Sequence, residues 1–176
     1  TKPYNGIESV YIEGKSSFEF LKKLSGSIDK VKFKSIEHGK PEDDDVCILG
    51  VDVGSTTTKA ILLNKKDNKM VADIYLRTNG NPVEAARNCY KEIKKQIAGK
   101  KIKIIALGVT GSGRQIVGLH GFTECVINEI ICHAAASVFF DKDVDTIFEI
   151  GGQDAKYTYL VNGVPADYAM NEACSA

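Results

Sequence analysis

VCILGVDVGSTTTK, residues 46–59, is the stretch that decides the fold. Its first eight residues form a largely apolar run of strand length. Gly54 ends this run, and one serine and three threonines follow it. A second apolar run, residues 60–63, follows at once, so the turn between the two predicted strands is tight. The N–H groups and hydroxyls of such a turn face whatever lies at the end of the strands.

This turn has the composition of a phosphate cradle. Gly54 lets a ligand approach the backbone closely. Small hydroxyl donors follow it: Ser55, Thr56, Thr57 and Thr58. Asp52 lies at the same end, and its carboxylate would repel an anion unless a divalent cation lay between them, so Asp52 predicts Mg²⁺ held through water. An ordinary hairpin with a Gly-Ser turn is the alternative.

Composition sets bounds on the class of protein. The 176 residues allow one ordinary domain or two small ones. Lys plus Arg and Asp plus Glu each total 23, so no net field attracts nucleic acid or an anionic membrane. No apolar run approaches the roughly 20 residues that span a bilayer, and there is no signal peptide, so we expect a soluble, cytoplasmic protein. Five cysteines without an export signal favour thiols or metal ligands over disulfides.

Residues 1–41 carry no recognisable chemistry. A short helix is predicted over 17–24 with Gly26 as its stop, then a short strand at Val31 and Phe33, before the acidic run 42–45 marks a boundary. We interpret 1–41 as a linker or the tail of a preceding module. That preceding module could be an upstream copy of the same domain. Because the chain starts without methionine and stops in the middle of an apparent element, we expect it to be a fragment.

From residue 46 onward the order of elements is regular. A three-strand meander is followed by a helix with Asn81 as its cap and Pro82 in its first position, and then by strands and helices in alternation. The predicted strands lie at 46–53, 58–63, 70–77, 102–109 and 124–127, and the predicted helices run from Asn81 to Gly99, over 115–119 and over 128–139. This order predicts a ribonuclease H-like α/β lobe with a mixed sheet, residues 42–141.

The opening pattern then repeats. A strand over 146–150 ends in a polar turn made of Gly151, Gly152, Gln153 and Asp154, and strands over 156–161 and 164–169 follow around an Asn-Gly hairpin. Both units place a glycine-containing polar turn between their first two strands. We therefore predict the beginning of a second similar lobe, residues 142–176, whose phosphate loop faces the first.

Five segments in this order resemble a known family: GVDVGSTTTK (50–59), GVTGSGR (108–114), NEIICHAAA (128–136), EIGGQDAKY (149–157) and MNEACSA (170–176). Together they are similar to the ATPase activators of 2-hydroxyacyl-CoA dehydratases, the BadF/BadG/BcrA/BcrD type. That family lies within the actin, sugar kinase and heat-shock ATPase superfamily. The resemblance covers residues 46–176 and implies the actin-like version of the lobe.

The resemblance implies roles for the polar turns. Residues 54–58 resemble the first phosphate loop of the superfamily and residues 151–154 the second, with ATP or ADP and Mg²⁺ between them. Glu149 stands where heat-shock ATPases carry an aspartate, and its longer side chain leaves its metal role open. Glu129 resembles the glutamate near the attacking water, and Gln153 is a second candidate for orienting that water. Lys59 and Arg114 each have two readings, phosphate contact or a structural role.

The cysteines distinguish this family from its relatives. Cys132 and Cys174 match the positions that in dehydratase activators supply thiolates to one [4Fe–4S] cluster shared across a homodimer. Burial as small apolar side chains is the alternative for this pair. The same burial is our prediction for the remaining cysteines, Cys47, Cys89 and Cys125. We expect His133 to be a neighbour of the ligands or a surface residue.

The function implied is ATP-driven electron transfer. A ferredoxin- or flavodoxin-like donor would reduce the cluster, and ATP hydrolysis would drive the electron to a 2-hydroxyacyl-CoA dehydratase or an acyl-CoA reductase. A sugar or carboxylate kinase of the same superfamily is one alternative, and a non-catalytic interaction fragment is another. Residues 1–176 alone are expected to hydrolyse ATP negligibly.

Overall fold

The computed structural model describes residues 24–32, 36–152 and 154–171. Contacts divide the chain into two units, residues 1–36 and 37–176. In the first unit, Leu24–Lys30 forms a 3₁₀ helix that is interrupted at Ser27, where φ is −123° and ψ is 17°. The helix predicted over 17–24, apart from its last residue, and the strand residue Phe33 lie outside the described residues.

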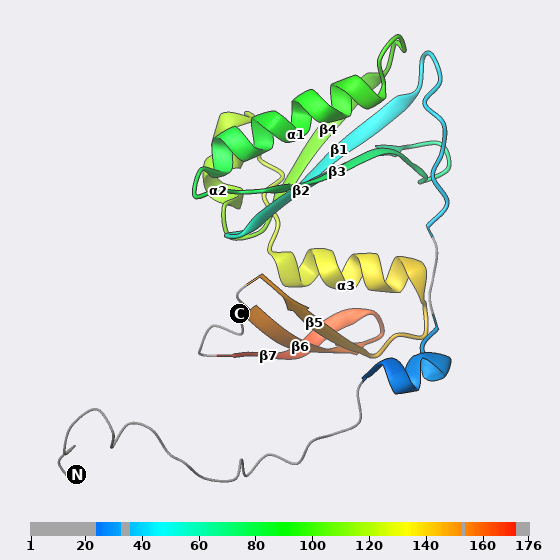
Figure 1. The fold of residues 1–176 in the computed structure, drawn as a ribbon, viewed down its shortest axis with the longest axis vertical. Helices are drawn as coiled ribbons and strands as arrows, with labels where there is room; N and C mark the ends of the chain where they lie inside the picture. Colours follow the sequence, from blue (N-terminus) through cyan, green and yellow to red (C-terminus); the bar gives the residue numbers. More distant parts are fainter. Residues whose placement is uncertain (1–23, 33–35, 153, 172–176) are drawn as a thin grey trace, which may run out of the picture. The chain divides into compact units, whose positions relative to one another are not determined.

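A four-stranded mixed sheet opens the second unit. Its strands are β1 (Val46–Val53), β2 (Thr57–Asn64), β3 (Met70–Arg77) and β4 (Lys103–Thr110), in the order β3-β2-β1-β4 (Figure 1). β1 pairs antiparallel with β2 and parallel with β4, while β2 pairs antiparallel with β3. The predicted meander and the mixed sheet are both confirmed.

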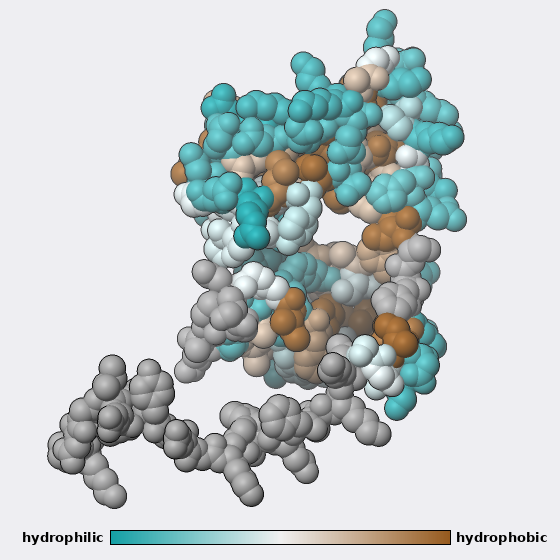
Figure 2. Space-filling model, viewed as in Figure 1, coloured by the Kyte–Doolittle hydropathy of each residue, from teal (hydrophilic) through white to brown (hydrophobic). Residues whose placement is uncertain are grey.

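α1 (Pro82–Gln96) supplies the crossover that the parallel pair requires. Its first turn is capped as predicted, because the Glu84 N–H donates to Asn81 Oδ1 over 3.1 Å. The apolar face of α1 packs on the face of β1 that alternate side chains bury, and the core there includes Cys47, Leu49, Val51, Val53, Ala86, Cys89 and Ile93. Lysines and an arginine cover its outer face, which is coloured teal in Figure 2.

The predicted strand over 124–127 is wrong. After β4, α2 (Arg114–His120) leads into a segment in which a single isolated bridge joins Val109 to Val126. Two hydrogen bonds make this bridge, from the Val109 N–H to the Cys125 carbonyl and from the Ile127 N–H to the Val109 carbonyl, each 2.9 Å long. Asn128 then already caps the next helix through its Oδ1, so the segment is too short to extend the ladder.

α3 (Glu129–Phe140) leads to a three-stranded antiparallel sheet of β5 (Thr146–Gly151), β6 (Asp154–Val161) and β7 (Val164–Met170), in the order β5-β6-β7. The Asn162-Gly163 hairpin is confirmed, with φ of +52° and +76° at the two turn residues. α3 contacts β6 and β7 (Figure 1). Among the described residues, the helices are all too short or too polar to cross a membrane.

Candidate functional site

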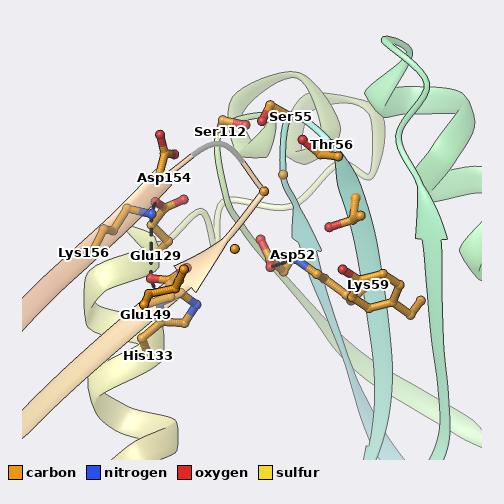
Figure 3. A pocket seen from close by; sticks show the side chains of 16 residues that line it. Asp52, Ser55, Thr56, Lys59, Ser112, Glu129, His133, Glu149, Asp154 and Lys156 are labelled. Carbon is orange, nitrogen blue, oxygen red and sulfur yellow. Dashed lines mark hydrogen bonds and ion pairs between the residues drawn. The ribbon is translucent and has the colours of Figure 1, made fainter. Parts of the chain in front are cut away.

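One polar cavity of about 490 Å³ is formed by the β1–β2 turn, the β5–β6 turn and the start of α3. The predicted site residues that line it are Asp52, Gly54, Ser55, Thr56, Thr57, Glu129, Glu149, Gly151, Gly152 and Asp154. In Figure 3, Asp52, Thr56 and Lys59 lie on one side of the cavity, and Glu129, Glu149, Asp154 and Lys156 lie on the other. Two turns that are far apart in the sequence therefore meet at one space.

Two predicted residues are not part of this lining. Thr58 is fully buried, and its Oγ1 lies 2.9 Å from Thr78 Oγ1, so its hydroxyl is used inside the fold. Thr58 departs from the sequence-based expectation because alternate residues of a strand face opposite sides, and Thr57 and Lys59 take the cavity side. Gln153 lies outside the described residues.

Both turns depend on glycine. The Gly54 N–H donates to the Thr57 carbonyl over 2.9 Å, and a Cβ at Gly54 would lie 2.9 Å from that same oxygen. Gly152 has φ of +62°, which favours glycine, and a Cβ there would lie 3.7 Å from Thr56 Oγ1. A side chain at position 152 would therefore touch the Thr56 hydroxyl of the first turn.

An ion pair closes the end of β1. Lys59 Nζ lies 3.0 Å from Asp52 Oδ2, and the two residues are directly opposite in the β1–β2 pairing. The same ammonium stands over the Tyr75 ring, 5.4 Å from its centre. In this structure Lys59 therefore neutralises the carboxylate for which the sequence predicted Mg²⁺. Arg114, the other cation with two readings, donates to the Gly111 carbonyl over 3.0 Å.

Four side chains form a network on the opposite wall. Lys156 Nζ donates to Glu129 Oε1 and lies 3.7 Å from Glu149 Oε2. Glu149 Oε2 also lies 2.7 Å from His133 Nδ1. The network links the first two turns of α3 to β5 and β6, and it gives His133 a contact beside Cys132 rather than a free surface position.

Charge in the cavity favours a cation. The burial of Lys156 alone would lower its pKa, but the hydrogen bond to Glu129 and the charges of Glu129, Glu149 and Asp154 together raise that pKa above 10.5. The ammonium is therefore charged at neutral pH. Four carboxylates in the lining (Asp52, Glu129, Glu149 and Asp154) face two ammonium groups (Lys59 and Lys156). An anionic ligand here needs a cation with it.

The donor set suits Mg²⁺ that is shared with a ligand. No cluster of three or more His, Cys, Asp or Glu side chains able to hold a metal occurs within the described ranges. Mg²⁺ commonly uses one or two carboxylates together with waters and substrate phosphates. The carboxylates on the cavity wall therefore fit a cation that arrives with a phosphate, and they do not fit a cage made by protein alone.

The cysteine thiols differ in how far they are buried. Cys132 is half-buried and lines a second, mainly apolar cavity of about 410 Å³, whose wall it shares with Asp52, Lys59 and His133. Cys174 lies outside the described residues. Cys47 and Cys89 are buried as predicted. The prediction for Cys125 is wrong, since this residue is exposed in the short segment that does not form a strand.

Ser112, His133 and Lys156 line the polar cavity without having been predicted as site residues. Ser112 falls within the glycine-rich turn after β4, a signal that the sequence did offer. Lys156 shares a strand face with the buried residues Thr158 and Leu160, and that alternation could have indicated an inward-pointing lysine.

Comparisons with known proteins agree with this geometry. The model of the BadF/BadG/BcrA/BcrD ATPase family matches residues 49–176. The (R)-2-hydroxyglutaryl-CoA dehydratase activating ATPase of Acidaminococcus fermentans is 34% identical over 128 residues, which are 73% of this chain and 48% of that protein. The chain spans about half the length of the curated relatives it matches.

Solved structures give the same answer for the fold. Component A of the A. fermentans dehydratase superposes with a TM-score of 0.63 at 30% identity, covering 74% of this chain and 49% of that one. The activator of the 2-hydroxyisocaproyl-CoA dehydratase from Clostridium difficile, solved with bound ADPNP, gives 0.64 at 30% identity, covering 74% and 47%. The expected actin-like α/β architecture is confirmed.

Proposed function

This chain belongs to the BadF/BadG/BcrA/BcrD ATPase family, and on that premise we propose that the full-length protein hydrolyses ATP in the polar cavity to activate a 2-hydroxyacyl-CoA dehydratase or an acyl-CoA reductase. The observation that carries the proposal is the meeting of two glycine turns, one from each sheet, at a single polar cavity. Backbone at close approach with hydroxyl donors beside it is suited to a polyphosphate.

The charges support a magnesium nucleotide rather than a bare anion. We propose that Asp52 holds Mg²⁺ through water and leaves its ion pair with Lys59 when the nucleotide binds. The excess of carboxylates over ammonium groups in the lining would repel free ATP and favour its magnesium complex. The ADPNP bound to the C. difficile activator, a relative of this chain, is consistent with a nucleotide ligand.

Water activation is assigned to the wall formed by α3. Glu129 and Gln153 remain the two candidates for orienting the attacking water, and Gly151, Gly152 and Asp154 would face the phosphates from the second turn. Phosphoryl transfer depends mainly on alignment and charge neutralisation, so this small set is chemically sufficient.

The electron-transfer half of the proposal rests on the family resemblance and on Cys132. We propose that Cys132 and Cys174 of two copies hold one [4Fe–4S] cluster in a homodimer, and that the cluster supplies a one-electron carrier. The half-buried thiol of Cys132 at the wall of a cavity is compatible with a ligand role. A ferredoxin- or flavodoxin-like protein would be the donor, and residues 142–176 would begin the second lobe.

The nucleotide proposal is tested with Asp52→Asn in the full-length protein. We expect MgADPNP to bind at least about tenfold more weakly and ATP hydrolysis to be lost, because the cation loses its carboxylate anchor. Asp143→Asn, in the exposed loop before β5, is the matched control and should match the wild type. Wild-type protein that neither binds MgADPNP nor hydrolyses ATP would overturn the proposal.

The cluster is tested separately by the iron and sulfide content of anaerobically prepared full-length protein. Cys132→Ala and Cys174→Ala should each lose iron, whereas Cys125→Ala should keep it, since Cys125 is exposed in a different segment. Iron-free wild-type protein that transfers phosphate to a sugar or a carboxylate would instead indicate a kinase of the same superfamily.

A further inference from the structure

We propose that Lys156 is a positioning residue for the hydrolysis proposed above: its ammonium, anchored by Glu149, holds the Glu129 carboxylate in place at the cavity wall. The inference rests on the proposed ATPase function and deepens it. It assigns a role to a residue that the sequence motifs left without one, and it gives the two glutamates different tasks.

The geometry starts from the pairing of secondary structure elements. Glu149 and Lys156 are direct partners in the antiparallel β5–β6 register. Glu129 and His133 lie four residues apart on α3, which places them on the same face of the helix, one turn from each other. Figure 3 shows these four side chains converging from the strands and the helix. The contacts run in the order His133, Glu149, Lys156, Glu129.

The burial of Lys156 explains why a cation there acts as an anchor. Its side chain is 8% exposed, while the side chain of Glu129 is 24% exposed. A buried ammonium needs charged hydrogen-bond partners. Packing around the long lysine stem also restricts its rotation. The position of Lys156 is therefore fixed by the fold, and Glu129 takes its orientation from it.

The two glutamates differ in what remains available on each. Glu149 is held at Oε2 by His133 over 2.7 Å, with Lys156 3.7 Å away, so it acts as the anchor of the ammonium. Glu129 contacts Lys156 through Oε1, and among the described residues Lys156 is its one partner. Oε2 of Glu129 is therefore the carboxylate oxygen left to accept a hydrogen bond from a water in the cavity.

The test compares Lys156→Met, Lys156→Arg and Lys142→Met in the full-length protein, with kcat and KM for ATP and the Kd of MgADPNP as readouts. We expect Lys156→Met to lower kcat by about 100-fold, the scale of a displaced general base, while Kd stays within about threefold. Lys156→Arg keeps the charge and should retain kcat within about tenfold of the wild type. Lys142 lies in an exposed loop, so Lys142→Met should match the wild type.

The outcomes separate this role from the function itself. If the wild type does not hydrolyse ATP, the proposed function fails. If the wild type is active and Lys156→Met keeps its kcat, or Lys156→Arg is as slow as Lys156→Met, the positioning role is overturned. A rise in Kd that matches the loss in kcat/KM would make Lys156 a nucleotide ligand and would overturn it too. Should Lys156→Met not fold, Lys156→Gln takes its place, and a Gln variant as fast as the Arg variant excludes a charge requirement.

Discussion

Two cysteine thiols, those of Cys89 and Cys125, differ in their exposure to solvent. Cys89 is fully buried on the face of α1 that packs on the sheet, and burial raises the pKa of its thiol to about 11. Cys125 is exposed beside β4. Because the thiolate is the reactive form, we predict that iodoacetamide at pH 8 labels Cys125 more than about tenfold faster than Cys89, as measured by peptide mass spectrometry.

Denaturation is the control for this labelling experiment. In urea both thiols are exposed to water, so their labelling rates should converge. Native Cys89 labelled at the rate of Cys125 would contradict the packing of α1 on the sheet.

Some properties of single residues could be predicted from the sequence, and others could not. Gly54 and Gly152 were predictable, because a turn that needs close approach requires glycine whatever surrounds it. The partners of Lys59 and Lys156 were not, because strand periodicity gives the face on which a charge lies and not the charge that meets it. The pairing of Lys156 with Glu129 depends on where α3 lies against β6.

At the scale of elements, the turn after β4 fixes the end of β1. Gly111 has φ of +87°, and a Cβ there would lie 2.5 Å from Asp52 Oδ1 and 2.6 Å from the Val53 carbonyl oxygen. We predict that Gly111→Ala costs about 1–3 kcal/mol in free energy of unfolding and weakens MgADPNP binding, because the added methyl group displaces Asp52. Urea unfolding and nucleotide titration measure the two effects.

Gly50→Ala is the matched control for that substitution. It lies in β1 itself, and the nearest atom to an added Cβ is Ile61 Cγ1 at 3.4 Å, an ordinary contact. Gly50→Ala should bind MgADPNP as the wild type does. Equal nucleotide affinity in both variants would show that the β4 turn does not position Asp52.

Elements with local signals were predicted well and those that depend on partners were not. α1 carries its own cap and apolar face, and β1–β3 follow one another as a meander, so each is encoded nearby. The segment 124–127 has apolar residues in a strand-like pattern, but β4 offers it one bridge before Asn128 starts α3. A strand exists only where a neighbour supplies its hydrogen bonds.

In the whole molecule, the second sheet, β5-β6-β7, has two different faces. One face lines the cavity, and the described residues leave the other face uncovered. Lys156, Thr158 and Leu160 are the buried residues of β6, whereas Phe148 of β5 is 74% exposed. The Phe148 ring lies against the ring of its cross-strand neighbour Tyr157, with 5.5 Å between the ring centres. In Figure 2, brown side chains appear over this part of the molecule.

An exposed apolar sheet face of this kind should bind a hydrophobic dye. We predict that a polypeptide of residues 37–176 enhances the fluorescence of 1-anilinonaphthalene-8-sulfonate, and that Phe148→Ser reduces the enhancement by about half because it removes the most exposed aromatic ring of the described part of this sheet. Phe122→Ser, at a phenylalanine that is 98% exposed in the turn after α2 and outside the second sheet, is the control and should leave the fluorescence unchanged. If the remainder of the full-length protein covers this face, the full-length protein gives less fluorescence per molecule. Equal fluorescence per molecule from residues 37–176 and from the full-length protein would mean that the sheet face stays exposed in the whole protein and is available to a partner.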